Sequence, residues 1–183
     1  MQSTHSMKHF LNRACLLASI AIVGTAITAC GSTHKPVADP ATTAGHLAAV
    51  DELDFRVIPT QTWSELDKSH SHDVIVHWPD GHVTTGLAKH TENLMALFAW
   101  APDTRIASHT VSLGQGDWTT VVATMEGTFT RSMRFGRPDV IAPTGKPYRI
   151  QLVTVGHWKN GVMDEKYLFW DNQSFDRQIG LAP

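Results

Sequence analysis

The spacing of apolar residues changes from mainly helical to mainly strand-like close to Pro102, and this change limits the fold more than any other feature. Before it, apolar residues recur at helical spacing over residues 47–58 and again over 87–101. After it, residues 104–171 alternate between apolar and polar positions, as strands do. Helices followed by a run of long strands indicate an α+β domain, with helices packed on one face of a curved antiparallel sheet. A sheet curved in this way leaves a cone-shaped cavity, where a ligand would bind.

Local signals place the individual elements. Pro59 ends or kinks the first helix, because proline lacks the N–H that a helix interior needs. Thr62 and Glu65 have the spacing of a capping box and predict a second helix that runs to about His70. The Asn160-Gly161 pair is the strongest hairpin signal in the chain. The other expected elements are a hairpin over 73–86, strands over 104–113, 118–129, 148–158 and 162–171, and a short final helix capped by Asn172 or Ser174.

The first thirty residues have the features of an export signal. Lys8 and Arg13 precede an apolar stretch, residues 14–29. This stretch is too short for a membrane span, and it ends in small residues, as a signal peptide does. Ile27-Thr28-Ala29-Cys30 follows, and it resembles the cleavage site of a bacterial lipoprotein. The resemblance implies a lipid at Cys30 and a location in the cell envelope, anchored in a membrane and facing the periplasm or the cell exterior. An ordinary signal peptide with a chance cysteine, or an uncleaved anchor, are the alternatives.

The rest of the chain divides into a tether and one domain. Residues 30–45 are small, polar and proline-bearing, so we expect a flexible tether, and residues 46–183 then form the folded domain. Cys15 and Cys30 are the only cysteines, so this domain has no disulfide and no thiol metal site. The net charge of −2 with no basic stripe argues against nucleic acid as a partner.

Four stretches of this domain resemble one family. They are HDVIVHWPDG with Gly86 after it, GDWTTVVATMEGTF, PTGKPYRI, and NGVMDEKYLFWD followed by FDRQIGL. In this order they resemble a SnoaL-like polyketide cyclase domain, within the nuclear transport factor 2-like (cystatin-like) superfamily. The resemblance implies a cone-shaped α+β fold that binds a small hydrophobic ligand. It also implies general acid–base chemistry of the cyclase, isomerase or hydrolase type that requires no metal or organic cofactor.

The family pattern directs attention to the last long strand. It has a Glu and, six residues later, an Asp that acts as general acid and base, and the matching residues here are Glu165 and Asp171. With period-2 alternation, Tyr167 and Phe169 share their face, which is the predicted cavity face. The alternatives are that Asp171 caps the helix after it and that Glu165 lies solvated at the rim. Lys166 and Tyr167 stand where the family often has His-Trp.

Several other residues are candidates for the same pocket. His157 faces the cavity and assists Asp171 if the hairpin loop has three residues, and faces away if it has two. His77 lies in the cavity or is a hydrogen-bonded core histidine. Trp100 is expected to line the cavity. Trp118 and Trp170 would support a sheet-to-sheet homodimer if both lie on the outer face.

Two further patterns were weighed. The 11 histidines invite a metal site, with His70, His72 and Asp73 as ligands, but no compact third-ligand motif is present, and we expect none. Arg131, Arg134 and Arg137 form a loop that could attract an anion. Two functions therefore remain: a cofactor-free enzyme with Asp171 at its centre, or a non-catalytic lipoprotein that binds a ligand or a protein.

Overall fold

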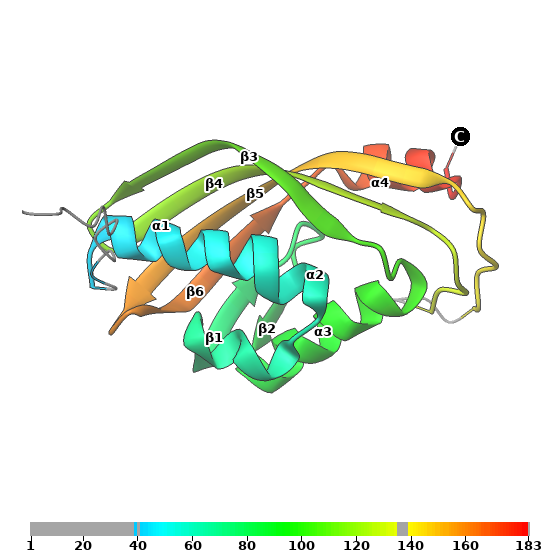
Figure 1. The fold of residues 1–183 in the computed structure, drawn as a ribbon. Helices are drawn as coiled ribbons and strands as arrows, with labels where there is room; N and C mark the ends of the chain where they lie inside the picture. The colour runs from blue at the N-terminus through cyan, green and yellow to red at the C-terminus, as the bar shows by residue number, and fades with distance from the viewer. Residues whose placement is uncertain (1–38, 40, 135–138, 183) are drawn as a thin grey trace, which may run out of the picture. The chain divides into compact units, whose positions relative to one another are not determined.

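Helices come first along the chain and long strands follow, as the sequence predicts (Figure 1). The computed structural model describes residue 39, residues 41–134 and residues 139–182. The predicted signal peptide, Cys30 and most of the expected tether lie outside the described residues, as does Arg137. The helical segments are α1 (Thr43–Glu52), η1 (Leu53–Val57), α2 (Ile58–Thr60), η2 (Trp63–Lys68), α3 (Leu87–Trp100) and α4 (Asn172–Ile179). The strands are β1 (His70–His77), β2 (Val83–Thr85), β3 (Arg105–Gln115), β4 (Trp118–Thr128), β5 (Pro147–Lys159) and β6 (Val162–Phe169).

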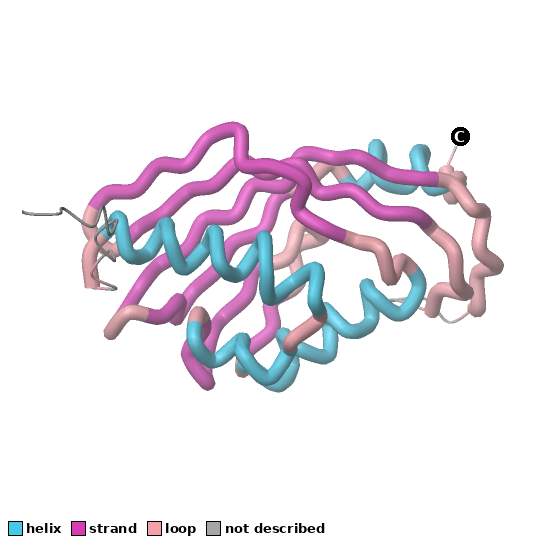
Figure 2. The backbone as a smooth tube through the Cα atoms, viewed as in Figure 1, coloured by secondary structure: helices cyan, strands magenta, loops and turns pink. Residues whose placement is uncertain are grey.

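The six strands form one curved sheet in the order β2-β1-β6-β5-β4-β3 (Figure 2). All neighbouring pairs are antiparallel except β1 and β6, which are parallel. This confirms the α+β class with helices on the concave face, and adds one parallel pair to a sheet expected to be antiparallel throughout. The described residues contain no helix with the length and apolarity needed to cross a membrane.

The first helical segment runs from Thr43 to Thr60 with a π-helical turn, η1, in its middle. Its start lies three residues before the expected domain boundary at residue 46, because the Thr42 hydroxyl accepts a hydrogen bond from the Gly45 N–H at 3.2 Å. The helix passes Pro59 and ends at Gln61, whose φ of 54° is left-handed. The π turn ends two residues before Pro59, which lacks the backbone N–H that a regular helix would use as a hydrogen-bond donor.

The second helical segment differs from the sequence prediction. Residues 63–68 form a 3-10 helix, and the Thr62 side chain makes no capping hydrogen bond. Glu65, expected to complete a capping box, instead pairs with Arg56 and with Lys68, whose Nζ lies 2.8 Å from Oε2. Burial of Leu66 therefore holds this segment in place without a capping box.

The long hairpin of β5 and β6 orients the site. Its turn is the predicted two-residue Asn160-Gly161 loop, with both φ angles positive. Beyond the turn the register shifts: Trp158 pairs with Met163 but His157 pairs with Glu165, so Asp164 is an extra, bulged residue. A bulge moves every later residue of β6 by one position relative to its partner strand.

The core lies between the concave face of the sheet and the helices. Trp158 and His46 stack at 4.7 Å and join α1 to β5. Trp100 and Phe129 meet edge to face at 5.3 Å where α3 approaches the end of β4. Near α3 and α4 this core opens into a cavity.

Candidate functional site

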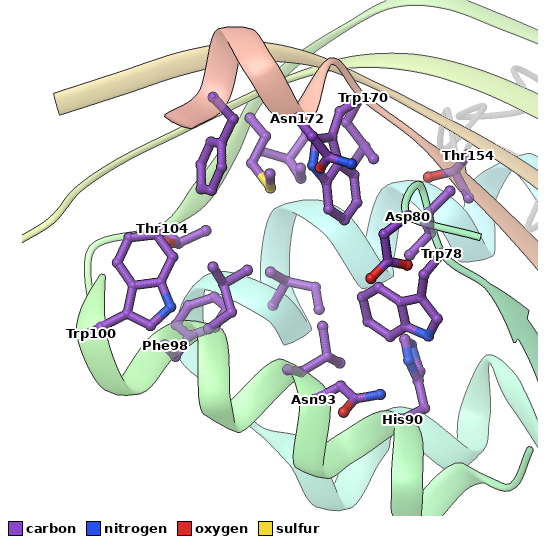
Figure 3. Close-up of a pocket in the computed structure, with 18 of the residues that line it drawn as sticks. Trp78, Asp80, His90, Asn93, Phe98, Trp100, Thr104, Thr154, Trp170 and Asn172 are labelled. Atoms are coloured by element: carbon purple, nitrogen blue, oxygen red, sulfur yellow. The ribbon is translucent and has the colours of Figure 1, made fainter. Parts of the chain in front are cut away.

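A cavity of about 420 Å³ lies between the inner face of the sheet, α3 and α4 (Figure 3). Figure 3 shows Asn93 and His90 of α3 on one side of it and Trp170 and Asn172 on the other. The lining is mainly apolar and aromatic. Its polar residues are Asp54, Asp80, His90, Asn93, Thr104, Thr154, Lys166, Asn172 and Asp176. The apolar lining residues are Ile58, Trp78, Leu94, Leu97, Phe98, Trp100, Ile106, Met125, Met133, Leu152, Leu168, Trp170, Phe175 and Ile179.

Aromatic rings shape the two ends of the cavity. Trp78 and Trp170 meet edge to face at 6.4 Å at one end. Trp100 and Phe175 do the same at 5.9 Å at the other. Large rigid rings fix the width of a pocket at little cost in conformational entropy, so the cavity is largely formed before any ligand enters.

Lys166 of β6 lines this cavity with its side chain buried at 7% exposure. Its Nζ lies 3.4 Å from Nε2 of His70. The Ser69 hydroxyl donates to the Leu66 carbonyl at 3.2 Å and lies 2.9 Å from Nδ1 of His70. The hydroxyl therefore accepts from Nδ1–H, which leaves Nε2 as an acceptor for the Lys166 amine. Burial lowers the pKa of Lys166, and the nearby charge of Asp54 offsets only part of that effect.

Several other polar atoms at the cavity have no hydrogen-bond partner. Both ring nitrogens of His90 are buried and unpaired, and so are Nδ2 of Asn93 and Nε1 of Trp100. The His90 ring lies 5.1 Å from that of His70, centre to centre. Burial holds the pKa of His90 well below its usual value. Unpaired buried donors are costly, and ligand oxygens are the groups that would satisfy them.

One carboxylate of the lining belongs to an ion pair. Asp54 Oδ2 lies 2.9 Å from Nε2 of His109, and Asp51 Oδ1 lies 3.0 Å from Nδ1 of the same ring. The hydrogen bond that His109 donates to Asp54 is the main cause that raises the pKa of His109, which favours the imidazolium. Asp54 is thus a carboxylate at the cavity wall that is already paired with a histidine.

The structure places Glu165, Tyr167 and His77 on the outer face of the sheet, opposite the cavity. The Tyr167 hydroxyl donates to Glu165 Oε1 at 2.8 Å, and Nε2 of His77 lies 2.8 Å from the same oxygen. The rings of His77 and Tyr167 stack at 4.1 Å. The hydrogen bond from Tyr167, then that from His77, lowers the pKa of Glu165. Their predicted cavity facing is corrected: Lys166, Leu168 and Trp170 face inward, and the residues between them face out.

Phe169 and His157 are also on the outer side. Phe169 is 53% exposed. His157 pairs with Glu165 across the strands, its Nδ1 lies 2.6 Å from Asp164 Oδ1, and its ring packs on Trp118 at 4.7 Å. A two-residue loop predicts that His157 faces away from the cavity and pairs with Asp164. In the structure His157 does face away, but its cross-strand partner is Glu165. The bulge at Asp164 accounts for the difference.

Asp171 occupies the N-cap position of α4. Its Oδ1 accepts the backbone N–H of Ser174 at 3.1 Å, and it is not among the residues that line the cavity. The capping alternative thus describes its geometry, and its predicted facing into the cavity is corrected. Of the predicted pocket residues, Trp100 lines the cavity. Trp170, weighed for the outer face, lines it too, whereas Trp118 is exposed on the outer face.

Sequence reasoning missed Lys166, His90, Asn93 and Asp54. One signal for Lys166 was available: it shares period-2 spacing with Leu168 and Trp170, which are as apolar as the outward set. The structure brings no three metal-ligating side chains together within its described residues. His70 is instead buried against Lys166 and His90.

Comparisons with known families and solved structures agree with the observed fold. Residues 50–179 match the model of the family described as SnoaL-like polyketide cyclase. No curated protein matches the chain significantly.

Solved structures share the fold at low sequence identity. A SnoaL-like protein of Jannaschia sp. CCS1, assigned as a polyketide cyclase, matches with a TM-score of 0.67 and 16% identity over 84% of this chain and 100% of its own. IdmH of Streptomyces antibioticus, also assigned as a polyketide cyclase, matches with 0.62 and 17% over 74% and 98%. A Catenulispora acidiphila protein with a ketosteroid isomerase-like fold, solved with trimethylamine, matches with 0.56 and 16% over 78% and 96%. At such identities the likeness shows the fold alone.

Proposed function

The chain belongs to the SnoaL-like polyketide cyclase family, and from this premise we propose that it binds a small, largely apolar molecule in the cavity between the sheet, α3 and α4. One observation carries the proposal: an aromatic-lined cavity of about 420 Å³ holds buried polar atoms that lack partners. Side chains that line an empty apolar cavity lack van der Waals contacts on one side, and the unpaired donors lack hydrogen bonds. A ligand with an apolar body and one or two oxygen atoms recovers both.

The chemistry proposed for this site is cofactor-free proton transfer on a carbonyl compound. Asp54 takes the role that the family resemblance assigned to Asp171, because it is a carboxylate at the cavity wall and is oriented there by His109. Asn93 and His90 would donate hydrogen bonds to the carbonyl oxygen. Donors aimed at that oxygen stabilise the negative charge that develops when Asp54 removes a proton from the adjacent carbon.

A non-catalytic binding protein is the second candidate, and one observation favours it. The residue that matches the family's acid, Asp171, caps α4, and His157 lies on the outer face. A cavity without the family's acid can still bind a ligand. Turnover of a bound ketone, measured as solvent deuterium exchange at its α-carbon, separates the two candidates. Exchange that is lost when Asp54 is substituted supports the enzyme.

Ligand binding is tested with octanol, which has the apolar chain but no carbonyl group. Trp78, Trp100 and Trp170 line the cavity, so binding should change the tryptophan fluorescence. Leu168→Trp should abolish binding by filling the cavity. Phe169→Trp is its matched control on the opposite face of the same strand and should bind normally. Native mass spectrometry of the purified protein should also show a co-purifying small molecule; a cavity that binds neither octanol nor any such molecule contradicts the proposal.

Export and lipid anchoring at Cys30 are part of the proposed function. The support is the sequence alone: a basic start, an apolar stretch, and Ile27-Thr28-Ala29 before the cysteine. Cys30→Ser should abolish labelling by palmitate and release the protein from the membrane fraction. Cys15→Ser, the same change within the apolar stretch, should leave both unchanged. Membrane association and labelling that survive Cys30→Ser would remove this part of the proposal.

The outer face of the sheet is proposed to pack against a second copy of the chain. The support is its exposed apolar surface, contributed by Val111, Leu113, Trp118 and Phe169. Phe169→Lys should convert a dimer to a monomer in light scattering, because a charge at a packed apolar interface is costly. Met95→Lys, at a similarly exposed apolar residue of α3 on the opposite side of the sheet, is the control and should leave the dimer intact.

A further inference from the structure

The amine of Lys166 has an environment that few lysines share. Its side chain reaches the cavity wall, yet no ion pair of the described residues joins it to a carboxylate. Its one hydrogen-bond partner is the neutral ring of His70, at 3.4 Å. The groups that face it are two histidines and Asp54: His70 on β1, His90 on α3, and Asp54 on η1, which is already paired with His109. A buried ammonium without a partner is strongly disfavoured, so this arrangement favours the neutral amine.

A neutral lysine amine in an apolar pocket is a nucleophile. The hydrogen bond to Nε2 of His70 requires a proton of the amine and leaves the nitrogen lone pair free. Exposed lysines are almost entirely protonated at neutral pH and have no free lone pair. The cavity therefore offers one nucleophilic amine beside a space that a ligand can enter.

We propose that Lys166 forms a reversible imine with an aldehyde or ketone group of the bound ligand. This deepens the proposed function and rests on it, because the carbonyl compound must first bind in the cavity. The proposal names the ligand class as apolar molecules with one accessible carbonyl carbon. Lys166 would then be a catalytic residue in the enzyme and a covalent anchor in the binding protein.

The reaction balances without an oxidant, a reductant or a cofactor. The lone pair of Nζ forms a bond to the carbonyl carbon, the C=O π electrons move to oxygen, and one proton moves from nitrogen to that oxygen. The resulting carbinolamine loses its hydroxyl together with the second nitrogen proton as water, and a C=N bond remains. Both proton movements need a carrier. His90 is the candidate, because its two ring nitrogens have no other partner and its ring lies 5.1 Å from that of His70.

The test is reductive trapping with octanal and sodium cyanoborohydride, which delivers hydride to an imine carbon and leaves a stable secondary amine. Peptide mass mapping then compares the rate of modification at Lys166 with the rates at the exposed Lys89 and Lys159 in the same tube. At about pH 6 we expect Lys166 to react faster than either exposed lysine, because burial leaves a larger fraction of its amine neutral. Lys166→Met should remove this adduct, and Lys159→Met, the matched control, should leave it.

A second comparison uses the unmodified Lys166 and so does not depend on the folding of the Met variant. Leu168→Trp should slow trapping at Lys166 to the rate of the exposed lysines, and Phe169→Trp should not. Equal rates at Lys166 and at Lys89 in a protein that binds octanol would overturn the imine and leave the binding function standing. A protein that does not bind octanol and is not trapped by octanal would overturn both.

Discussion

The capping role of Asp171 gives the sharpest prediction, because a cap and a catalytic acid respond differently to the same two substitutions. The α4 helix has only eight residues, and its first turn is held by the Asp171 carboxylate at 3.1 Å from the Ser174 N–H. Asp171→Ala removes the acceptor and leaves that N–H unpaired. Asp171→Asn keeps an acceptor of the same length and removes only the charge.

The expected magnitudes follow from this geometry. Loss of an N-cap acceptor costs about 1 kcal/mol, which lowers the melting temperature of a domain of this size by about 3 °C. Asp171→Asn should cost less than half as much, because only the interaction of the charge with the helix dipole is lost. Octanol affinity should change less than about threefold in both variants, since Asp171 does not line the cavity.

Urea denaturation, monitored by tryptophan fluorescence, measures the free energy of unfolding. The octanol titration measures the ligand affinity of the cavity. Two results would refute the reasoning. Equal destabilisation by Asp171→Ala and Asp171→Asn would show that the hydrogen bond to Ser174 is not what the residue contributes. Loss of proton transfer in a stable, ligand-binding Asp171→Asn protein would return the catalytic role to Asp171.

Two further predictions concern the buried polar groups and the packing of the sheet. Burial holds the pKa of His90 well below its usual 6.5, so the folded protein binds fewer protons there than the unfolded chain, and stability is lost as pH falls through about 6.5. His90→Phe should therefore reduce the loss of unfolding free energy between about pH 7 and about pH 5; an unchanged loss would contradict the assignment. Gly127→Ala should destabilise the protein by about 1–3 kcal/mol, measured by urea denaturation, because an added Cβ would lie 2.7 Å from the Tyr148 hydroxyl, which is itself fixed by a 2.6 Å hydrogen bond to Thr104. A stability equal to that of the unchanged protein would show that Tyr148 can move aside.

The fold was predictable because its signals are local. The helical spacing of residues 87–101 and the alternation after residue 104 each concern neighbours along the chain, and Asn160-Gly161 determines its own turn. The parallel pairing of β1 with β6 was not predicted, because it joins segments about ninety positions apart and no turn connects them. The capping box predicted at Thr62 is absent for a similar reason: Glu65 pairs with Arg56, which belongs to the preceding helix.

The facing of β6 could not be derived from its own residues. Tyr167 and Phe169 on one face are as apolar as Leu168 and Trp170 on the other, so alternation alone selects neither face for the core. The family's acidic position appeared to settle the choice in favour of Asp171. A charged residue is also a weak signal for burial, since lysines are almost never fully buried unless paired. The sequence therefore did not predict Lys166, the residue that marks the inner face, at the cavity.

The two faces of β6 differ less in which polar groups they carry than in whether those groups are satisfied. On the outer face, Glu165 receives hydrogen bonds from both Tyr167 and His77, and each of these bonds is 2.8 Å long. Such a network is already satisfied and gains little by binding anything else. On the inner face, Lys166 has one long hydrogen bond and His90 has none. The free energy available for recognition therefore lies on the inner face. The chemistry of this domain should be sought there rather than at Glu165 and Asp171, the carboxylates that the sequence makes conspicuous.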